Sequence, residues 1–125
     1  MKREFSELSH LVIGAAIEVH RHLGPGLLES TYQQCLAREL DLNHIAFKLE
    51  HPLPVEYKDI RLDCGYRIDI FVEDAIILEL KSVEELKRIH EAQLLTYMKL
   101  AQIKQGFLIN FNVVKLKQGL RSFVL

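Results

Sequence analysis

The sequence lacks the features that would place this 125-residue chain in a membrane or outside the cell. No apolar run approaches the roughly 20 residues that a helix needs to cross a bilayer. Residues 1–7 contain no apolar stretch of the kind that forms the centre of a signal peptide. These absences predict a cytoplasmic protein with no membrane partner.

Cysteine and net charge are also scarce. The two cysteines, Cys35 and Cys64, form no Cys-x-x-Cys pair, which argues against a zinc site or a disulfide framework and favours reduced structural thiols. Sixteen basic and 17 acidic residues leave a formal net charge of −1. A pure DNA-binding module usually carries a positive field, so this balance weakens that class more than it weakens an enzyme whose site contains acids.

The chain shows no repeat, linker or low-complexity segment, so residues 1–125 predict one domain with a single core. Apolar residues at helical spacing predict a helix over 6–22 and another over 27–42, separated by the turn Gly24-Pro25-Gly26. A capping-box pattern over 82–85 predicts the start of a third helix. The expected strands, in an antiparallel meander up to residue 81, cover residues 45–50, 55–58, 60–62, 66–72, 76–81, 106–111, 113–116 and 120–125.

The stretch 66–81 organises the rest of the chain. Two runs rich in β-branched and apolar residues flank the polar segment 73–75, which predicts a β-hairpin whose three-residue loop is centred on Asp74. In that register Asp69 falls directly opposite Glu79. The two carboxylates are then expected to be cross-strand neighbours, with Cβ atoms roughly 4.5–5.5 Å apart.

Side-chain alternation gives the hairpin one apolar and one polar face. The expected core face holds Ile68, Ile70, Val72, Ile76, Leu78 and Leu80. The opposite face holds Arg67, Asp69, Phe71, Ile77, Glu79 and Lys81. Like charges facing each other destabilise a sheet, so Asp69 and Glu79 require a compensating partner. A divalent cation is one such partner, and diagonal ion pairs with Lys81 or Arg67 on a solvated face are the other.

The polar residues on the expected helices can have structural as well as functional roles. Glu29 in the first turn of the second helix and His20 near the end of the first suit the helix dipoles, and His20 is only a weak site candidate. On the third helix, Gln93 and Tyr97 lie four residues apart on a mostly apolar stripe, where polar tips need partners. That stripe is expected to consist of Leu86, Ile89, His90, Gln93, Tyr97 and Leu100.

Two spacings resemble those of a known enzyme superfamily. Asp69, followed after nine residues by Glu79-x-Lys81, resembles the D…(D/E)xK signature of the PD-(D/E)XK nuclease superfamily. Gln93-x-x-x-Tyr97 on the next helix is similar to the QxxxY element of its exonuclease-like branches. The segment Gly26-Leu27-Leu28-Glu29-Ser30-Thr31-Tyr32 fits the motif of the GxxExxY protein family, a branch of that superfamily. The resemblance implies a restriction-endonuclease-like α/β sandwich, in which helices flank a mixed, mainly antiparallel central sheet.

The same resemblance implies a role for each motif residue. Asp69, Glu79 and the backbone carbonyl of Leu80 would bind Mg²⁺, or Mn²⁺ in its place, since hard oxygen ligands suit such ions. Lys81 would orient or help deprotonate the attacking water, and Glu29 would add a carboxylate. The supporting positions are Gln93, Tyr97, Tyr32 and Gly26.

Two functions remain open from the sequence. The first is a metal-dependent nuclease that hydrolyses phosphodiester bonds in nucleic acid, in DNA rather than RNA. The alternative is a non-catalytic module of the same fold that binds nucleic acid or a protein partner. Intact Asp69, Glu79 and Lys81 favour the nuclease, because a binding module has no need of opposed acids. The near-neutral charge and small size favour a homodimer or a protein partner as the source of substrate specificity.

Overall fold

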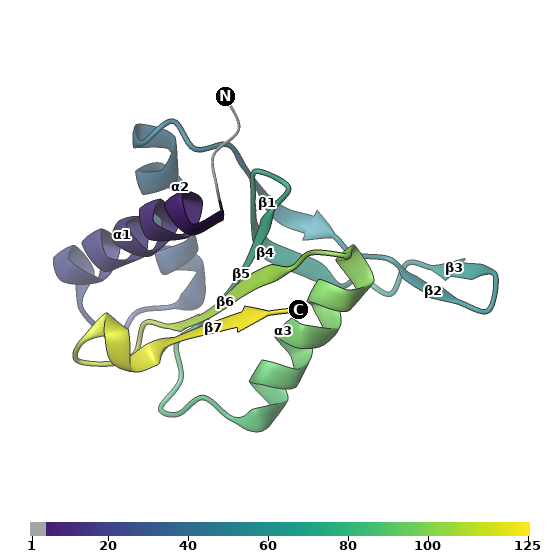
Figure 1. Cartoon of the computed structure of the whole chain (residues 1–125). Helices are drawn as coiled ribbons and strands as arrows, with labels where there is room; N and C mark the ends of the chain where they lie inside the picture. Colours follow the sequence, from purple (N-terminus) through teal and green to yellow (C-terminus); the bar gives the residue numbers. More distant parts are fainter. Residues whose placement is uncertain (1–4) are drawn as a thin grey trace.

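A computed structural model describes residues 5–125, with side chains from residue 7 onward, and has the predicted mixed α/β architecture (Figure 1). Residues 1–4, part of the segment expected to lack a signal peptide, lie outside the described residues. In chain order the elements are α1 (Phe5–Leu23), α2 (Glu29–Leu42), β1 (Phe47–Pro52), β2 (Val55–Tyr57), β3 (Ile60–Leu62), β4 (Arg67–Val72), β5 (Ile76–Lys81), α3 (Arg88–Ala101), β6 (Gln105–Asn110), the 3₁₀ helix η1 (Leu116–Gly119) and β7 (Leu120–Val124). Within 5–125, every helix is too short or too polar to cross a membrane.

The main sheet has five strands in the order β1-β4-β5-β6-β7. All neighbours are antiparallel except β5 and β6, which are parallel and therefore need the crossover that α3 provides. The predicted mixed, mainly antiparallel sheet is confirmed. The predicted meander is wrong, because β1 pairs with β4 while β2 and β3 pair with each other and project from the body (Figure 1). The Leu53 N–H, which donates to the Tyr66 carbonyl at 2.9 Å, closes the base of this projecting hairpin.

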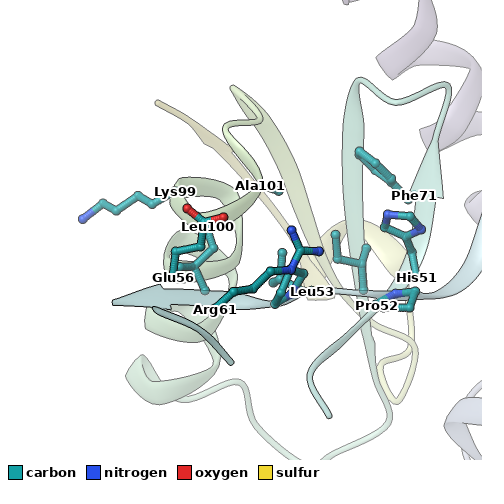
Figure 2. A pocket seen from close by; sticks show the side chains of 11 residues that line it. His51, Pro52, Leu53, Glu56, Arg61, Phe71, Lys99, Leu100 and Ala101 are labelled. Atoms are coloured by element: carbon teal, nitrogen blue, oxygen red, sulfur yellow. The ribbon is translucent and has the colours of Figure 1, made fainter. Parts of the chain in front are cut away.

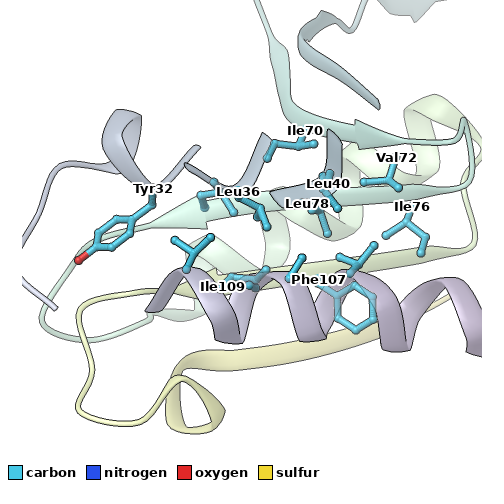
Figure 3. Packing of buried hydrophobic residues seen from close by; sticks show 14 of the residues in the cluster. Tyr32, Leu36, Leu40, Ile70, Val72, Ile76, Leu78, Phe107 and Ile109 are labelled. Carbon is cyan, nitrogen blue, oxygen red and sulfur yellow. The ribbon is translucent and has the colours of Figure 1, made fainter. Parts of the chain in front are cut away.

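Helices cover both faces of the sheet, so the expected single core is divided into two apolar clusters. On one face, α1 and α2 cover the sheet, and Leu36 of α2 lies in the same cluster as Ile70 of β4 (Figure 3). On the other, Leu94 of α3 packs on Phe71 and Ile77. These last two side chains are 8% and 0% exposed, so the prediction that their face is polar is wrong. Strands buried on both faces carry apolar residues without strict alternation.

The alternation of β4 breaks at Asp69. Ile68 belongs to the cluster under α3 together with Phe71, whereas Ile70 belongs to the cluster under α1 and α2. The β1–β4 ladder is interrupted at the same level, where Glu50 and Asp69 form no ladder pair and Glu50 has a φ of 50°. Such a backbone is uncommon for a residue with a Cβ atom. The prediction that Ile68 shares a face with Ile70 is therefore wrong, and the distortion lies beside a candidate site residue.

The third helix begins later than its predicted capping box at 82–85. The Ser82 hydroxyl donates to the Leu27 carbonyl at 2.6 Å instead of capping a helix. The Asn110 side chain accepts from the Val83 N–H at 3.1 Å and donates to the Val83 carbonyl at 2.9 Å. These tertiary bonds hold the segment as a loop, and α3 starts at Arg88. The capping-box prediction is wrong because its hydroxyl is engaged elsewhere.

The apolar stripe of α3 also differs from the prediction. Leu94 and Met98 are fully buried, while Ile89 is 70% exposed and Leu100 is 36% exposed. The buried stripe therefore runs through Leu94, Tyr97 and Met98, not through Ile89 and Leu100. The helix ends at Ala101.

Two smaller predictions also need correction. Residues 113–116 are not a strand; they lead into η1, and β7 follows it directly. Both cysteines are free as predicted, and Cys35 packs against the cluster under α1 and α2. Cys64 is exposed, so the prediction of a structural thiol is wrong at that position.

Candidate active site

Asp69 and Glu79 lie side by side where the β4–β5 ladder ends. The ladder keeps the predicted register up to the Ile70–Leu78 pair. Beyond it, Glu79 Oε1 accepts from the Asp69 backbone N–H at 3.3 Å, and Asp69 Oδ2 accepts from the Leu80 backbone N–H at 2.8 Å. The two strands are thus joined at this level through the carboxylates themselves. The structure brings together the two acids that the sequence placed opposite each other.

Burial raises the pKa values of both acids. Glu79 is 5% exposed, and burial, followed by repulsion from Asp69, raises its pKa to about 8. Burial also raises the pKa of Asp69, although the hydrogen bond from the Leu80 N–H acts in the opposite direction. The positive charge of Lys81 lowers the pKa of both groups without cancelling the effect of burial. Without a bound cation, the pair therefore retains a proton near neutral pH.

Two further acids surround Asp69. Glu50 of β1 and Glu29 at the start of α2 each raise the pKa of Asp69 by charge repulsion. Both carboxylates are exposed, so they form the open side of the site above the buried Glu79 and the half-buried Asp69. Lys81 is the positively charged residue that lies near Asp69 and Glu79.

Tyr32 fixes the turn that precedes Glu29. Its hydroxyl donates to the Gly24 carbonyl at 2.6 Å and accepts from the Leu27 backbone N–H at 3.2 Å. Gly26 has a φ of 96°, a conformation that favours glycine because it has no Cβ atom. The Leu27 carbonyl in turn accepts from Ser82, immediately after β5. The glycine, the tyrosine and the turn therefore hold Glu29 next to the end of the strand that carries Glu79.

We expect Tyr32→Phe to lower the free energy of unfolding by about 1–3 kcal/mol, because two part-buried hydrogen bonds, each contributing about 0.5–1.5 kcal/mol, are lost. The ring itself should stay stacked on Phe111, from which it is separated by 4.4 Å between centroids. Urea denaturation measures the change. Tyr57→Phe is the control, because Tyr57 is 58% exposed and should change stability by less than about 0.5 kcal/mol. Equal stabilities for the two variants would show that the turn does not depend on the Tyr32 hydroxyl.

Gln33 and Glu50 are site residues that the sequence analysis missed. Gln33 Nε2 donates to the Asp69 carbonyl at 2.9 Å and to Glu50 Oε1 at 3.1 Å, and so fills the gap in the β1–β4 ladder. Gln33 lies four residues after Glu29, so helical spacing offered a signal for it. Glu50 offered none, because its position depends on the pairing of β1 with the distant strand β4.

Gln93 and Tyr97 lie together on α3, and Tyr97 is within electrostatic range of the two carboxylates. Gln93 Nε2 donates to the Tyr97 hydroxyl at 3.2 Å, and the Tyr97 ring meets Tyr66 edge-on at 6.0 Å. Burial raises the pKa of Tyr97, and the charges of Glu79 and Asp69 add to that effect. His20 is bonded elsewhere, with Nε2 2.8 Å from the Val113 carbonyl oxygen.

A comparison with models of known protein families assigns this chain to a family. A family model described as the PD-(D/E)XK nuclease superfamily matches residues 6–123. The chain belongs to the PD-(D/E)XK nuclease superfamily. No curated protein and no solved structure matches it. Membership indicates a nuclease-type function with nucleic acid binding, and the five-stranded sheet flanked by helices is consistent with the restriction-endonuclease-like fold.

PD-(D/E)XK nucleases generally depend on a divalent metal, so the donor groups of this member matter. Within residues 5–125, no three side chains of His, Cys, Asp or Glu form a group that could hold an ion. Two carboxylates, those of Asp69 and Glu79, and one backbone oxygen, that of Leu80, are the candidate donors. The Leu80 N–H points at Asp69, and the N–H and C=O of a strand residue face the same neighbour, so this carbonyl also faces β4. Oxygen donors of this kind suit Mg²⁺, which usually retains several waters.

Proposed function

We propose that this chain is a metal-dependent nuclease that hydrolyses phosphodiester bonds, in DNA rather than RNA. The observation that supports this most is the close pair of carboxyls on Glu79, which is buried, and Asp69, which is half-buried, whose pKa values are both raised beside Lys81. Burying two acids together destabilises a fold unless a cation balances them. Membership of the GxxExxY branch, a single domain over residues 1–125 and a cytoplasmic location are parts of the same proposal.

The residues have distinct tasks in this proposal. Asp69, Glu79 and the Leu80 carbonyl would hold Mg²⁺ or Mn²⁺. The bound ion supplies a water of lowered pKa and positive charge for the phosphate in the transition state. The positive charge of Lys81 lowers the pKa of both carboxyls, so its ammonium group lies near them. From there it would donate to a phosphate oxygen and orient the attacking water. Glu29 adds a carboxylate on the exposed side of the site, where a water can be held.

A cleavage assay tests this proposal. Labelled single- and double-stranded DNA and RNA are incubated with the protein in Mg²⁺, in Mn²⁺ or in chelator. We expect cleavage only with metal, no cleavage by Lys81→Ala, and wild-type rates for Lys117→Ala, an exposed lysine in η1. Identical products and rates for wild type and Lys81→Ala would contradict a nuclease. The non-catalytic module, with its nucleic acid or protein partner, would then be the better description.

We expect Tyr97→Phe to fold normally and to cleave about 10- to 100-fold more slowly, because its hydroxyl, which accepts from Gln93, lies within range of the charges of Glu79 and Asp69 and can donate to a water of the site. The measurement combines thermal melting with single-turnover cleavage. Tyr57→Phe serves again as the control. Unchanged cleavage by Tyr97→Phe would leave this residue with only a structural role in the packing of α3 on the sheet.

A further inference from the structure

A cavity of about 440 Å³ opens on the α3 side of the sheet (Figure 2). It lies between β1, the β2–β3 hairpin and the last turn of α3. Its floor is formed by the buried side chains of Leu53, Ile68 and Phe71. Ile68 and His51, which pair across the β1–β4 ladder, directly neighbour Asp69 and Glu50 of the candidate site. The cavity is therefore adjacent to the candidate active site.

Rings and charged groups line the cavity above this floor. The His51 and Phe71 rings form one wall, with centroids 5.3 Å apart. In the view of Figure 2, the Arg61 guanidinium lies between this wall and the Glu56 carboxylate. Among the residues that the structure describes, Arg61 forms no ion pair, and Glu56 is its cross-strand neighbour in the β2–β3 ladder. The cavity thus combines ring surface and an apolar floor with one guanidinium, that of Arg61, that can bind an anion.

This combination of groups suits a whole nucleotide better than a base alone or a phosphate alone. A planar base can cover the apolar floor and stack on a ring, while its phosphate can pair with Arg61. Glu56 would repel a free phosphate but can accept a hydrogen bond from an amino group of a base. The volume lies within the range of about 300–1,000 Å³ that is usual for small-ligand pockets.

We propose that this cavity binds one unstacked nucleotide of a single strand, next to the phosphate to be cleaved. The inference rests on the proposed nuclease function and adds its substrate class, which is single-stranded nucleic acid or an unpaired end. A base inside a duplex is stacked and paired, and it can enter such a cavity only after it has been extruded. Duplex of the same sequence is therefore bound less tightly.

The test measures binding by fluorescence anisotropy in Mg²⁺, in a Lys81→Ala background that prevents cleavage. The probe is a labelled oligonucleotide of about 12 nucleotides, single-stranded or annealed to its complement. We expect the single strand to bind about tenfold more tightly than the duplex, and Arg61→Ala to remove most of that difference. Arg38→Ala is the matched control, because Arg38 is exposed on α2 and pairs with Asp41 at 3.6 Å. Thermal melting establishes that each variant is folded.

A second set of probes carries one abasic position, moved along the single strand. We expect one abasic position to weaken binding about as much as Arg61→Ala does, and to cause no further loss in that variant, because both changes remove the same contact. Equal affinity for single strand and duplex, with Arg61→Ala and every abasic probe bound as tightly as the reference, would overturn the proposal. If wild type cuts no substrate but this pattern of binding is present, the nuclease proposal fails and the nucleotide site stands.

Discussion

Glu79→Gln should lower the rate of metal-dependent cleavage by on the order of 10³-fold, because the charge that holds the cation contributes several kcal/mol to stabilising the transition state. Gln has nearly the shape of Glu and can still accept the hydrogen bond from the Asp69 N–H, so the fold should be retained. Single-turnover kinetics in saturating Mg²⁺ measure the loss.

Glu84→Gln is the matched control for that experiment. Glu84 is exposed in the loop after β5 and the same substitution there should leave the rate unchanged. If Glu79→Gln retained the wild-type rate while folding normally, Glu79 would not be a ligand of a catalytic ion.

The second large effect concerns stability against pH in chelator. The folded protein holds the Glu79 proton up to a pKa of about 8, whereas the unfolded chain releases it near the ordinary value of 4.5. Between these values the folded state binds more protons than the unfolded state, so the free energy of unfolding should fall as pH rises and level off above about 8. Each unit of difference in pKa corresponds to about 1.4 kcal/mol.

Urea denaturation across that range measures the slope, and Glu79→Gln should reduce it strongly. Asp69→Asn should likewise stabilise the chelated protein at high pH, since it removes one of the two charges. Mg²⁺ should stabilise only the wild type, by about 2.7 kcal/mol at a hundredfold excess over its dissociation constant. A wild type indifferent to Mg²⁺, together with a less stable Asp69→Asn variant in chelator, would favour an ordinary ion pair of Asp69 with Lys81.

Local patterns predicted the part of the site that depends on neighbours in sequence. The loop centred on Asp74 sets the β4–β5 register and hence the approach of Asp69 to Glu79. The spacing of Gln93 and Tyr97 likewise predicted their contact across one helical turn. Such features follow from the geometry of a single element or hairpin.

Features that depend on distant contacts were missed. The meeting of Gln33, Glu50 and Asp69 requires the pairing of β1 with β4, which no local pattern specifies. The predicted helix start at Ser82 failed because the Leu27 carbonyl, remote in sequence, binds its hydroxyl. The second apolar cluster had a signal in the nearly continuous apolar run of β5, which is typical of a strand covered on both faces.

The location of Mn²⁺ in crystals soaked with MnCl₂ tests the proposed metal site most directly, because the anomalous signal of the ion marks its position without a substrate. We predict a peak within about 2.2 Å of one oxygen of Asp69, one of Glu79 and the Leu80 carbonyl, with water in the remaining positions. The peak should be absent from Glu79→Gln crystals treated in the same way. Crystals with Mn²⁺ bound at other positions, and no peak between Asp69 and Glu79, would contradict a metal-dependent nuclease built on this pair.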